Sequence, residues 1–378
     1  MRLVILGGGF AGLRAASGAS ALTRSGVEVL LVDRNSYATM IPSLPDAAGG
    51  RMNPDFLKED IRALLPDGIR FLQAEIRGIN LERREIETSR GLERYDALVL
   101  ATGSEAQCGP YEAMRSHIHP LARLEDAERI RDEFSDYCRR APSPRCVMAG
   151  AGYTGLELAG NLAALAEKLG KRVAFTIVEK APAILPFLNA REKRRVDGFL
   201  ARNSFDLRMG VSLESLDGGT IRLTDGTIFK DAFLCWSVGT CFSVNRVEGR
   251  LERLTDGRIK VSRELQVPAH PEVFACGDAA AMEHRGGYLR KAVNFAFYSG
   301  LRAGKNAAAF LLEHKMKPFR PVDLGWVIPL VDDSVGRIMG GLPVWGRTGL
   351  RLHYFMCGYR NFSGRNMRAF IRMALRLK

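Results

Sequence analysis

A glycine-rich turn near the start of the chain limits the possible folds more than any other sequence feature. Residues 2–6 are typical of an apolar strand, residues 7–12 have the pattern GxGxxG, and a helix is expected directly after them. Gly7 allows the tight turn, Gly9 lets the backbone approach a pyrophosphate, and Gly12 lets the helix pack close to the strand. A second strand at 27–32 ends in Asp33, whose carboxylate can accept hydrogen bonds from a ribose. The segment therefore predicts a βαβ unit that binds a dinucleotide.

The same pattern returns 143 residues further along the chain. A strand at 146–149 leads into GAGYTG at 150–155 and a helix, and the next strand, 173–178, ends in Glu179. Two complete fingerprints predict two bound dinucleotides. An acid beside the second ribose repels a 2′-phosphate and binds a 2′-hydroxyl, so NADH is favoured over NADPH, although Lys180 weakens that preference.

Three later segments add to the two fingerprints. They are DALVLATG at 96–103, WSVG at 236–239 and VFACGD at 273–278. Together with the first fingerprint they resemble the two-dinucleotide flavoprotein family, over about residues 1–315. The resemblance implies that the first fold binds FAD, that an inserted second fold binds the nicotinamide dinucleotide, and that the chain returns to the FAD fold through Gly277 and Asp278. It also implies that Asp278 accepts hydrogen bonds from the ribityl chain and diphosphate region of FAD.

The region after Asp33 distinguishes branches of that family. Disulfide reductases carry a CxxxxC pair there, whereas residues 35–50, NSYATMIPSLPDAAGG, contain no cysteine. Electrons on the flavin are therefore expected to pass directly to a second substrate. The stretch from Pro42 to Gly50 resembles the PLLPxxAxG segment of membrane-associated quinone reductases, and GYTGLELAG at 152–160 is similar to the type II NADH dehydrogenases. In that family the acid matching Glu157 lies near the nicotinamide and the flavin N5.

One segment departs from the type II NADH dehydrogenase pattern. The family usually shows AQxAxQxG on the helix after the Gly-Asp motif, with glutamines that line the quinone pocket. Residues 293–300 are VNFAFYSG, so Asn294 and Tyr298 replace both glutamines. Each keeps a hydrogen-bonding group that can reach a quinone carbonyl, and a quinone stays the predicted acceptor.

Three alternatives remain open at this point. A sulfide:quinone oxidoreductase-like enzyme would need cysteines near the flavin, one of them within the second glycine turn, where the chain has Tyr153 and Thr154. A soluble NADH-dependent reductase would use the basic surface to bind a small acidic electron carrier. A flavin- and NADH-binding redox sensor would show little turnover with quinones.

The fingerprints and the resemblance together define the candidate site. The expected catalytic residues are Glu157, Asn294 and Tyr298. The expected cofactor-binding residues are Gly7, Gly9, Phe10, Ala11, Gly12, Asp33, Arg34, Pro42, Ala101, Thr102, Gly103, Gly150, Gly152, Tyr153, Thr154, Gly155, Glu179, Gly239, Gly277 and Asp278. The seven cysteines show neither disulfide nor zinc spacing, so we expect reduced thiols and no metal site.

Positive charge is concentrated at the C-terminal end of the chain. The formal net charge is +13, and the residues after Asp333 include nine arginines or lysines and no acid. Arg365, Arg368, Arg372 and Arg376 recur at helical spacing, with apolar residues such as Phe370 and Leu377 between them, and aromatic residues such as Tyr354, Phe355 and Phe362 precede them. This composition predicts a basic amphipathic helix on an anionic membrane surface. The alternative is a helix packed on its own domain, and nucleic acid is not expected because no recognised binding module accompanies the patch.

We therefore predict an α/β protein with two Rossmann-like dinucleotide-binding domains, the NADH domain inserted in the FAD domain, and a C-terminal membrane-associating segment. Residues 1–105 and 272–318 are assigned to FAD, 106–271 to NADH and 319–378 to the membrane-associating segment. The predicted activity is hydride transfer from NADH to FAD and then two-electron reduction of a membrane quinone, without proton pumping. The expected location is cytoplasmic, peripheral on the inner face of the plasma membrane, because the chain starts directly with a strand. A homodimer is left open.

Overall fold

The computed structural model describes residues 1–376 except 243, 245, 361 and 362. The chain forms two compact units, and each is built from several chain segments. Unit 1 comprises Met1–Ala38, Glu59–Glu105 and Thr240–Asp323, and unit 2 comprises Thr39–Lys58, Ala106–Gly239 and Leu324–Lys378. This division into compact units is drawn differently from the predicted cofactor-binding domains, because residues 240–271 belong to unit 1 and residues 39–58 to unit 2. The assignment of each cofactor to its domain stays a prediction.

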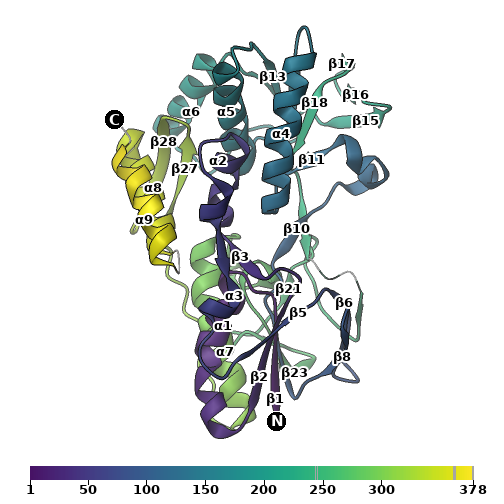
Figure 1. The fold of residues 1–378 in the computed structure, drawn as a ribbon, viewed down its shortest axis with the longest axis vertical. Coiled ribbons are helices and arrows are strands. Elements are labelled where there is room, and N and C mark those ends of the chain that lie inside the picture. The colour runs from purple at the N-terminus through teal and green to yellow at the C-terminus, as the bar shows by residue number, and fades with distance from the viewer. Residues whose placement is uncertain (243, 245, 361–362, 377–378) are drawn as a thin grey trace. The chain divides into compact units, whose positions relative to one another are not determined.

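Unit 1 is organised around a six-stranded sheet (Figure 1). Its strand order is β22 (Gln266–Val267), β23 (His270–Ala275), β9 (Ala97–Leu100), β1 (Arg2–Leu6), β2 (Glu28–Asp33) and β5 (Arg70–Gln73). All neighbours are parallel except β22 and β23. Residues 3–6 of β1 and 97–100 of β9 are wholly buried, which explains why both strands are continuous apolar runs.

Two helices of unit 1 pack against each other with almost no space between their backbones. They are α1 (Phe10–Ala19) and α7 (Val293–Leu311). A Cβ atom on Gly300 would lie 2.1 Å from the Ala11 carbonyl oxygen, and one on Gly304 would lie 2.0 Å from that of Ala15. The two glycines therefore bring the helix that carries Asn294 and Tyr298 directly onto the helix of the first glycine turn.

Smaller elements complete unit 1. A four-stranded sheet has the order β20 (Val247–Glu248), β6 (Ile76–Asn80), β7 (Glu85–Thr88) and β8 (Gly91–Arg94). The remaining strands and helices are β21 (Ile259–Lys260), β24 (Ala280–Ala281), β25 (Glu283–His284), β26 (Gly287–Tyr288), β19 (Thr240–Phe242), η1 (Ser20–Ser25), α3 (Ile61–Leu64) and η5 (Gly277–Ala279). Strands β3 (Tyr37–Thr39), β4 (Lys58–Asp60) and β10 (Ser104–Ala106) span the positions where the chain passes from one unit to the other.

Unit 2 contains a second parallel sheet of the same kind. Its order is β11 (His119–Pro120), β18 (Phe233–Trp236), β12 (Arg145–Ala149), β13 (Ala174–Glu179) and β14 (Asp206–Met209). Two antiparallel three-stranded sheets accompany it, β15 (Leu213–Asp217) with β16 (Thr220–Leu223) and β17 (Ile228–Phe229), and β27 (Gly325–Leu330) with β28 (Asp333–Ile338) and β29 (Leu342–Trp345). Its helices are η2 (Ile41–Ser43), α2 (Leu44–Ala48), η3 (Pro54–Leu57), η4 (Gly109–His117), α4 (Leu124–Arg140), α5 (Tyr153–Lys168), α6 (Ala190–Arg202), α8 (Gly346–Tyr359) and α9 (Gly364–Arg376).

The C-terminal helices α8 and α9, yellow in Figure 1, lie side by side within unit 2. The predicted basic helix is present as α9, and its residues Phe370 and Ala374 are buried. Tyr354 is also fully buried, so the expectation that it faces a bilayer interface is wrong. Phe362, Leu377 and Lys378 of the predicted membrane-associating segment lie outside the described residues. Among the helices that the structure describes, none combines the length and hydropathy needed to cross a membrane.

Candidate dinucleotide-binding and electron-transfer site

The first glycine turn connects β1 to α1 at the carboxyl end of the sheet in unit 1. Gly7 has a φ of +103°, and a Cβ atom on it would lie 2.4 Å from the Ala101 carbonyl oxygen. A Cβ on Gly12 would lie 1.7 Å from the Gly7 carbonyl oxygen. Neither position can therefore hold a larger residue without moving backbone. A Cβ on Gly9 would have no neighbour within 4 Å, so the turn leaves open space at the first residue before the helix.

Asp33 connects the end of β2 to this turn. Its Oδ2 atom accepts a hydrogen bond of 2.6 Å from the Gly8 N–H, and its Oδ1 atom accepts one of 2.8 Å from the Asn35 N–H. Burial raises the pKa of the Asp33 carboxyl, while these backbone donors act in the opposite direction. The side chain is thus fixed beside the glycine turn, in the position expected for an acid that binds a ribose.

The second glycine turn, in unit 2, repeats this geometry. Gly150 has a φ of +96°, and a Cβ on Gly155 would lie 2.0 Å from the Gly150 carbonyl oxygen. The Glu179 carboxylate accepts hydrogen bonds of 2.9 Å from the N–H groups of Ala151 and Ala181. A Cβ on Gly152 would again have no neighbour within 4 Å. The predicted duplication is therefore present in the backbone and in the acid that follows it.

Both helices begin without a side-chain cap. Gly9 precedes α1 and Gly152 precedes α5, and neither helix receives a side-chain hydrogen bond at this position. By contrast, Asn189 caps α6 by accepting hydrogen bonds from the Arg191 and Glu192 N–H groups. The first N–H groups of a helix attract anions, so the two uncapped ends fit the pyrophosphates of two dinucleotides.

The Gly-Asp motif adjoins the first turn within unit 1. Gly277 has a φ of +65°, and a Cβ on it would lie 2.8 Å from the Ala11 Cβ. Burial raises the pKa of Asp278, and the positive charges of Lys291 and Arg258 act against that increase. The sequence does not single out Lys291 and Arg258, because an isolated basic residue forms no recognisable motif. Because their charges act on Asp278, we add both residues to the candidate site.

The other predicted cofactor-binding residues divide between the two units. Unit 1 contains Phe10 and Ala11 in the first glycine turn, and Ala101, Thr102 and Gly103 directly after β9. It also contains Arg34, which forms an ion pair with Glu105. In unit 2 are Pro42, Thr154, Gly239 and Tyr153. The Tyr153 ring stacks on Phe187 with a centroid distance of 5.6 Å and meets Trp326 edge-on at 6.0 Å.

Glu157 lies in unit 2 within a buried group of polar side chains. It is the fifth residue of α5, in the second turn, and helix α2 brings Asp46 against it, since a Cβ on Gly49 would lie 2.6 Å from the Asn161 Cβ. Tyr354 of α8 donates a hydrogen bond of 2.8 Å to Asp46 Oδ1, and Arg51 lies 3.8 Å from the same oxygen. Burial raises the pKa of Asp46 to about 6 and holds that of Glu157 well above its ordinary value.

Within this group the single positive charge of Arg51 faces the carboxyls of Asp46 and Glu157. We therefore infer that at neutral pH one of the two carboxyls is ionised and the other is protonated. Arg51 and the Tyr354 hydroxyl favour ionised Asp46, and Glu157 is then the protonated partner. Glu157 Oε1 and Asp46 Oδ2 are buried and have no hydrogen-bond partner among the described residues. Asp46 and Tyr354 were not predicted, because they come from segments far apart in the sequence.

Asn294 and Tyr298 take different positions on α7. Asn294 is buried, and its side-chain amide donates a hydrogen bond to the Val322 carbonyl. The Tyr298 side chain is exposed, and its ring meets Phe297 edge-on at 5.5 Å. Asn294 therefore positions the chain segment around Val322, and Tyr298 is the more accessible of the two.

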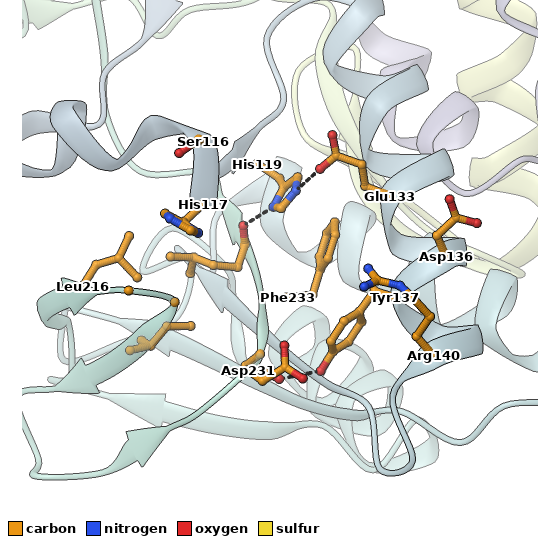
Figure 2. Close-up of a pocket in the computed structure, with 15 residues that line it drawn as sticks. Ser116, His117, His119, Glu133, Asp136, Tyr137, Arg140, Leu216, Asp231 and Phe233 are labelled. Carbon is orange, nitrogen blue, oxygen red and sulfur yellow. Dashed lines mark hydrogen bonds and ion pairs between the residues drawn. The ribbon is translucent and has the colours of Figure 1, made fainter.

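A separate hollow of about 510 Å³ lies in unit 2 between α4, β18 and the β15–β16 hairpin (Figure 2). His119 Nε2 lies 2.7 Å from a Glu133 carboxylate oxygen, and His119 Nδ1 lies 3.0 Å from the Leu234 carbonyl oxygen. Its ring stacks on Phe233 at a centroid distance of 3.9 Å. None of the predicted site residues is among the described residues that line this hollow.

Comparison with known proteins gives a family and several relatives. The pyridine nucleotide-disulphide oxidoreductase family matches residues 1–298. The type II NADH:quinone oxidoreductase of Staphylococcus aureus is 25% identical over 375 residues, with 92% of this chain and 91% of the relative covered. The enzyme of the same name from Staphylococcus haemolyticus is 25% identical over 362 residues, with 90% of each covered.

Solved structures share the fold of the whole chain. NDH2 from Plasmodium falciparum in complex with NADH superposes with a TM-score of 0.82 at 14% identity, covering 99% of this chain and 97% of that one. The sulfide:quinone oxidoreductase of Aquifex aeolicus gives 0.78 at 18% identity, covering 98% and 92%. The predicted α/β fold class with two dinucleotide-binding folds is confirmed.

Proposed function

The chain belongs to the pyridine nucleotide-disulphide oxidoreductase family, and we propose that it is a flavoprotein that oxidises NADH and reduces a membrane quinone. The observation that carries this proposal is the duplicated glycine turn, with an acid fixed beside each copy. The type II NADH:quinone oxidoreductases of two staphylococci align over nine-tenths of the chain and support the same activity. The reaction transfers two electrons and pumps no protons.

The residues of unit 1 fit FAD. The uncapped end of α1, the open space at Gly9 and the fixed Asp33 carboxylate suit the pyrophosphate and ribose of the dinucleotide. Asp278, with Lys291 beside it, suits the ribityl and diphosphate region. FAD, when bound, supplies the two-electron acceptor and donor that amino-acid side chains lack.

The residues of unit 2 fit NADH. The uncapped end of α5 and the open space at Gly152 suit its pyrophosphate. The Glu179 carboxylate is fixed by two backbone N–H groups and cannot turn away from a 2′-phosphate without losing them. Repulsion of that phosphate favours NADH over NADPH.

The cysteines argue against the disulfide and sulfide chemistries of related enzymes. All seven are free thiols, and six of them are buried. No cysteine occurs between Asp33 and Gly50 or within the second glycine turn. Electrons from the flavin therefore meet no disulfide in those segments, and an external acceptor such as a quinone is required.

The C-terminal helices supply a surface for the membrane. Although Phe370 and Ala374 of α9 are buried, Leu375 is exposed, as are Phe355 and Tyr359 of α8. Arg365, Arg368 and Arg372 are exposed on α9. We propose that this basic and partly apolar surface binds an anionic leaflet, which places the enzyme at the inner face of the plasma membrane.

Stopped-flow spectroscopy tests the activity. The flavin-loaded protein is mixed with NADH, or with NADPH as the control, and the reduced protein is then mixed with a short-chain quinone. We expect rapid flavin bleaching with NADH, slower bleaching with NADPH, and rapid reoxidation by quinone. Bleaching followed by reoxidation too slow for turnover would overturn the quinone assignment and favour a carrier-protein acceptor or a sensor.

Sedimentation with liposomes tests the membrane surface separately. The triple variant R365Q/R368Q/R372Q should lose binding to anionic liposomes and keep its NADH-driven flavin reduction. The variant K168Q/R172Q, which removes two charges from exposed residues at and just after the end of α5, is the control. Equal binding of both variants would contradict the role of α9.

A further inference from the structure

The outer face of α7 in unit 1 borders a groove that is lined by the predicted catalytic residue Tyr298 and by none of the predicted cofactor-binding residues. The groove has a volume of about 500 Å³. One wall is α7, and the other is the segment 317–322, which follows α7 in the chain. The lining residues are Tyr298, Leu301, Arg302, Lys305, Lys317, Pro318, Phe319, Arg320 and Val322.

Hydrogen bonds fasten the segment 317–322 to α7 at both ends and to Arg263 between them. Asn306, which is 2% exposed, donates to the Lys317 carbonyl at 2.8 Å and accepts from the Lys317 N–H at 3.1 Å. The Phe319 N–H donates to the Arg263 carbonyl at 2.7 Å, and Asn294 donates to the Val322 carbonyl. The segment is thus fixed at its beginning, middle and end, and the groove is formed before any ligand binds.

Four positive charges surround this groove without compensation. They belong to Arg302, Lys305, Lys317 and Arg320, and none of them forms an ion pair with any residue that the structure describes. Elsewhere in unit 1 arginines are commonly paired, as Arg290 is with Asp323. The described lining of the groove includes no acid. Four like charges around one groove repel each other, and an anion relieves that repulsion.

The remaining lining is apolar and open to solvent. Val322 is 57% exposed and Tyr298 is 41% exposed, and Leu301, Pro318 and Phe319 are also part of the lining. A small inorganic anion would leave this surface in water. An anionic amphiphile would cover it and neutralise the cations at the same time.

We propose that the α7 groove binds one anionic phospholipid molecule, with the phosphodiester among the four cations and the glycerol and first acyl carbons along Tyr298, Phe319 and Val322. This site is distinct from the surface of α9, which belongs to unit 2. The inference goes beyond the proposed function, because the binding requires neither NADH nor a quinone.

Calorimetric titration of the flavin-loaded protein with a monomeric short-chain lipid tests the proposal. Dihexanoyl phosphatidylglycerol, below its micelle concentration, should bind the wild type with a defined stoichiometry. The variant R302Q/K305Q should bind it about tenfold more weakly or worse, because two of the four cations are removed. The variant K168Q/R172Q removes the same charge elsewhere and should retain this binding. If R302Q/K305Q fails to fold, K317Q/R320Q gives the same test from the other wall.

Two further titrations decide between ligand sources. Dihexanoyl phosphatidylcholine, which carries no net charge, should bind at least tenfold more weakly than dihexanoyl phosphatidylglycerol. Inorganic phosphate should compete with the phosphatidylglycerol only at far higher concentration. Equal binding of the choline lipid would overturn the role of the cations. Competition by phosphate at the same concentration as the lipid would show that the apolar part of the lipid adds nothing to binding, and would overturn the proposal of an amphiphilic ligand. Loss of lipid binding with intact NADH oxidation would leave the proposed function standing, so the two failures are distinguishable.

Discussion

The two glycine turns of the molecule have nearly the same backbone and different side-chain chemistry. Gly7 and Gly150 have φ values of +103° and +96°. Their N–H groups donate hydrogen bonds of 2.8 Å to the carbonyl oxygens of Val32 and Val178, respectively. The acids Asp33 and Glu179 each accept two backbone hydrogen bonds. The spacing of three glycines and one acid thus determines the local structure twice.

The turns differ two residues after the third glycine. At that position α1 has Arg14, whose guanidinium lies 4.2 Å from the centre of the Phe297 ring. In α5 the position is occupied by Glu157, which is buried beside Asp46. The glycine turn therefore fixes the backbone of the predicted dinucleotide site. The residue two positions after the third glycine, Arg14 or Glu157, decides the sign of the charge near the start of the helix.

The largest effect is expected from the glycine in the first turn of each helix, which lies against the carbonyl of the turn's first glycine. Replacing Gly12 or Gly155 by alanine places a Cβ about 2 Å from a carbonyl oxygen, so the helix must move away from the strand. We expect each variant to lose about 3 kcal/mol or more of unfolding free energy. Chemical denaturation measures this loss, and flavin absorbance should be lost in G12A first.

The alanine variants at Gly9 and Gly152 are the matched controls, because their Cβ atoms meet no neighbour within 4 Å. They should unfold like the wild type and lose dinucleotide affinity. If G12A and G9A were equally stable, the close helix-strand approach would not be what requires glycine.

The second effect concerns the acid pair behind the second turn. Burial raises the pKa of Asp46 from 3.8 to about 6, so the native protein holds this proton more tightly than the unfolded chain. This stabilisation is complete below pH about 4 and is lost as the pH rises through about 6, which corresponds to about 2 to 3 kcal/mol. Unfolding free energies of the wild type and D46N should therefore differ in slope over this range. The exposed variant D67N should follow the wild type, and an identical slope in D46N would contradict the assignment.

A third test separates the two acids that follow the strands. In E179Q one backbone N–H faces an amide instead of a carboxylate, so we expect the KM for NADH to rise about tenfold while flavin content is unchanged. In D33N the pattern should be reversed, with faster flavin loss and an unchanged KM. Steady-state kinetics and flavin release rates measure both. A variant that changed both cofactors equally would break the assignment of one acid to each dinucleotide.

The sequence predicted the parts of the site that depend on local spacing. The turns, the acids Asp33 and Glu179 and the basic helix α9 were found because each is contained in one short segment. Asp46, Tyr354 and Lys291 were missed, since their roles arise from contacts between distant segments. The expectation that Tyr354 faces a bilayer interface was wrong for the same reason. An aromatic residue near arginines has the same local pattern whether it faces a lipid or a buried carboxylate.

The smallest effect is expected at Arg14, the counterpart of Glu157. Its guanidinium gains about 0.5 to 1 kcal/mol from the Phe297 ring. Its Nε atom, however, is buried and has no hydrogen-bond partner among the described residues, and burial lowers the pKa of the group. Replacement by methionine removes both the attraction and the unsatisfied donor, so the unfolding free energy of R14M should stay within about 1 kcal/mol of the wild type. Chemical denaturation beside the exposed control R24Q measures this. A loss above about 2 kcal/mol would show that the cation stabilises the fold; a value near zero leaves this position free to differ between the turns, as Arg14 and Glu157 do.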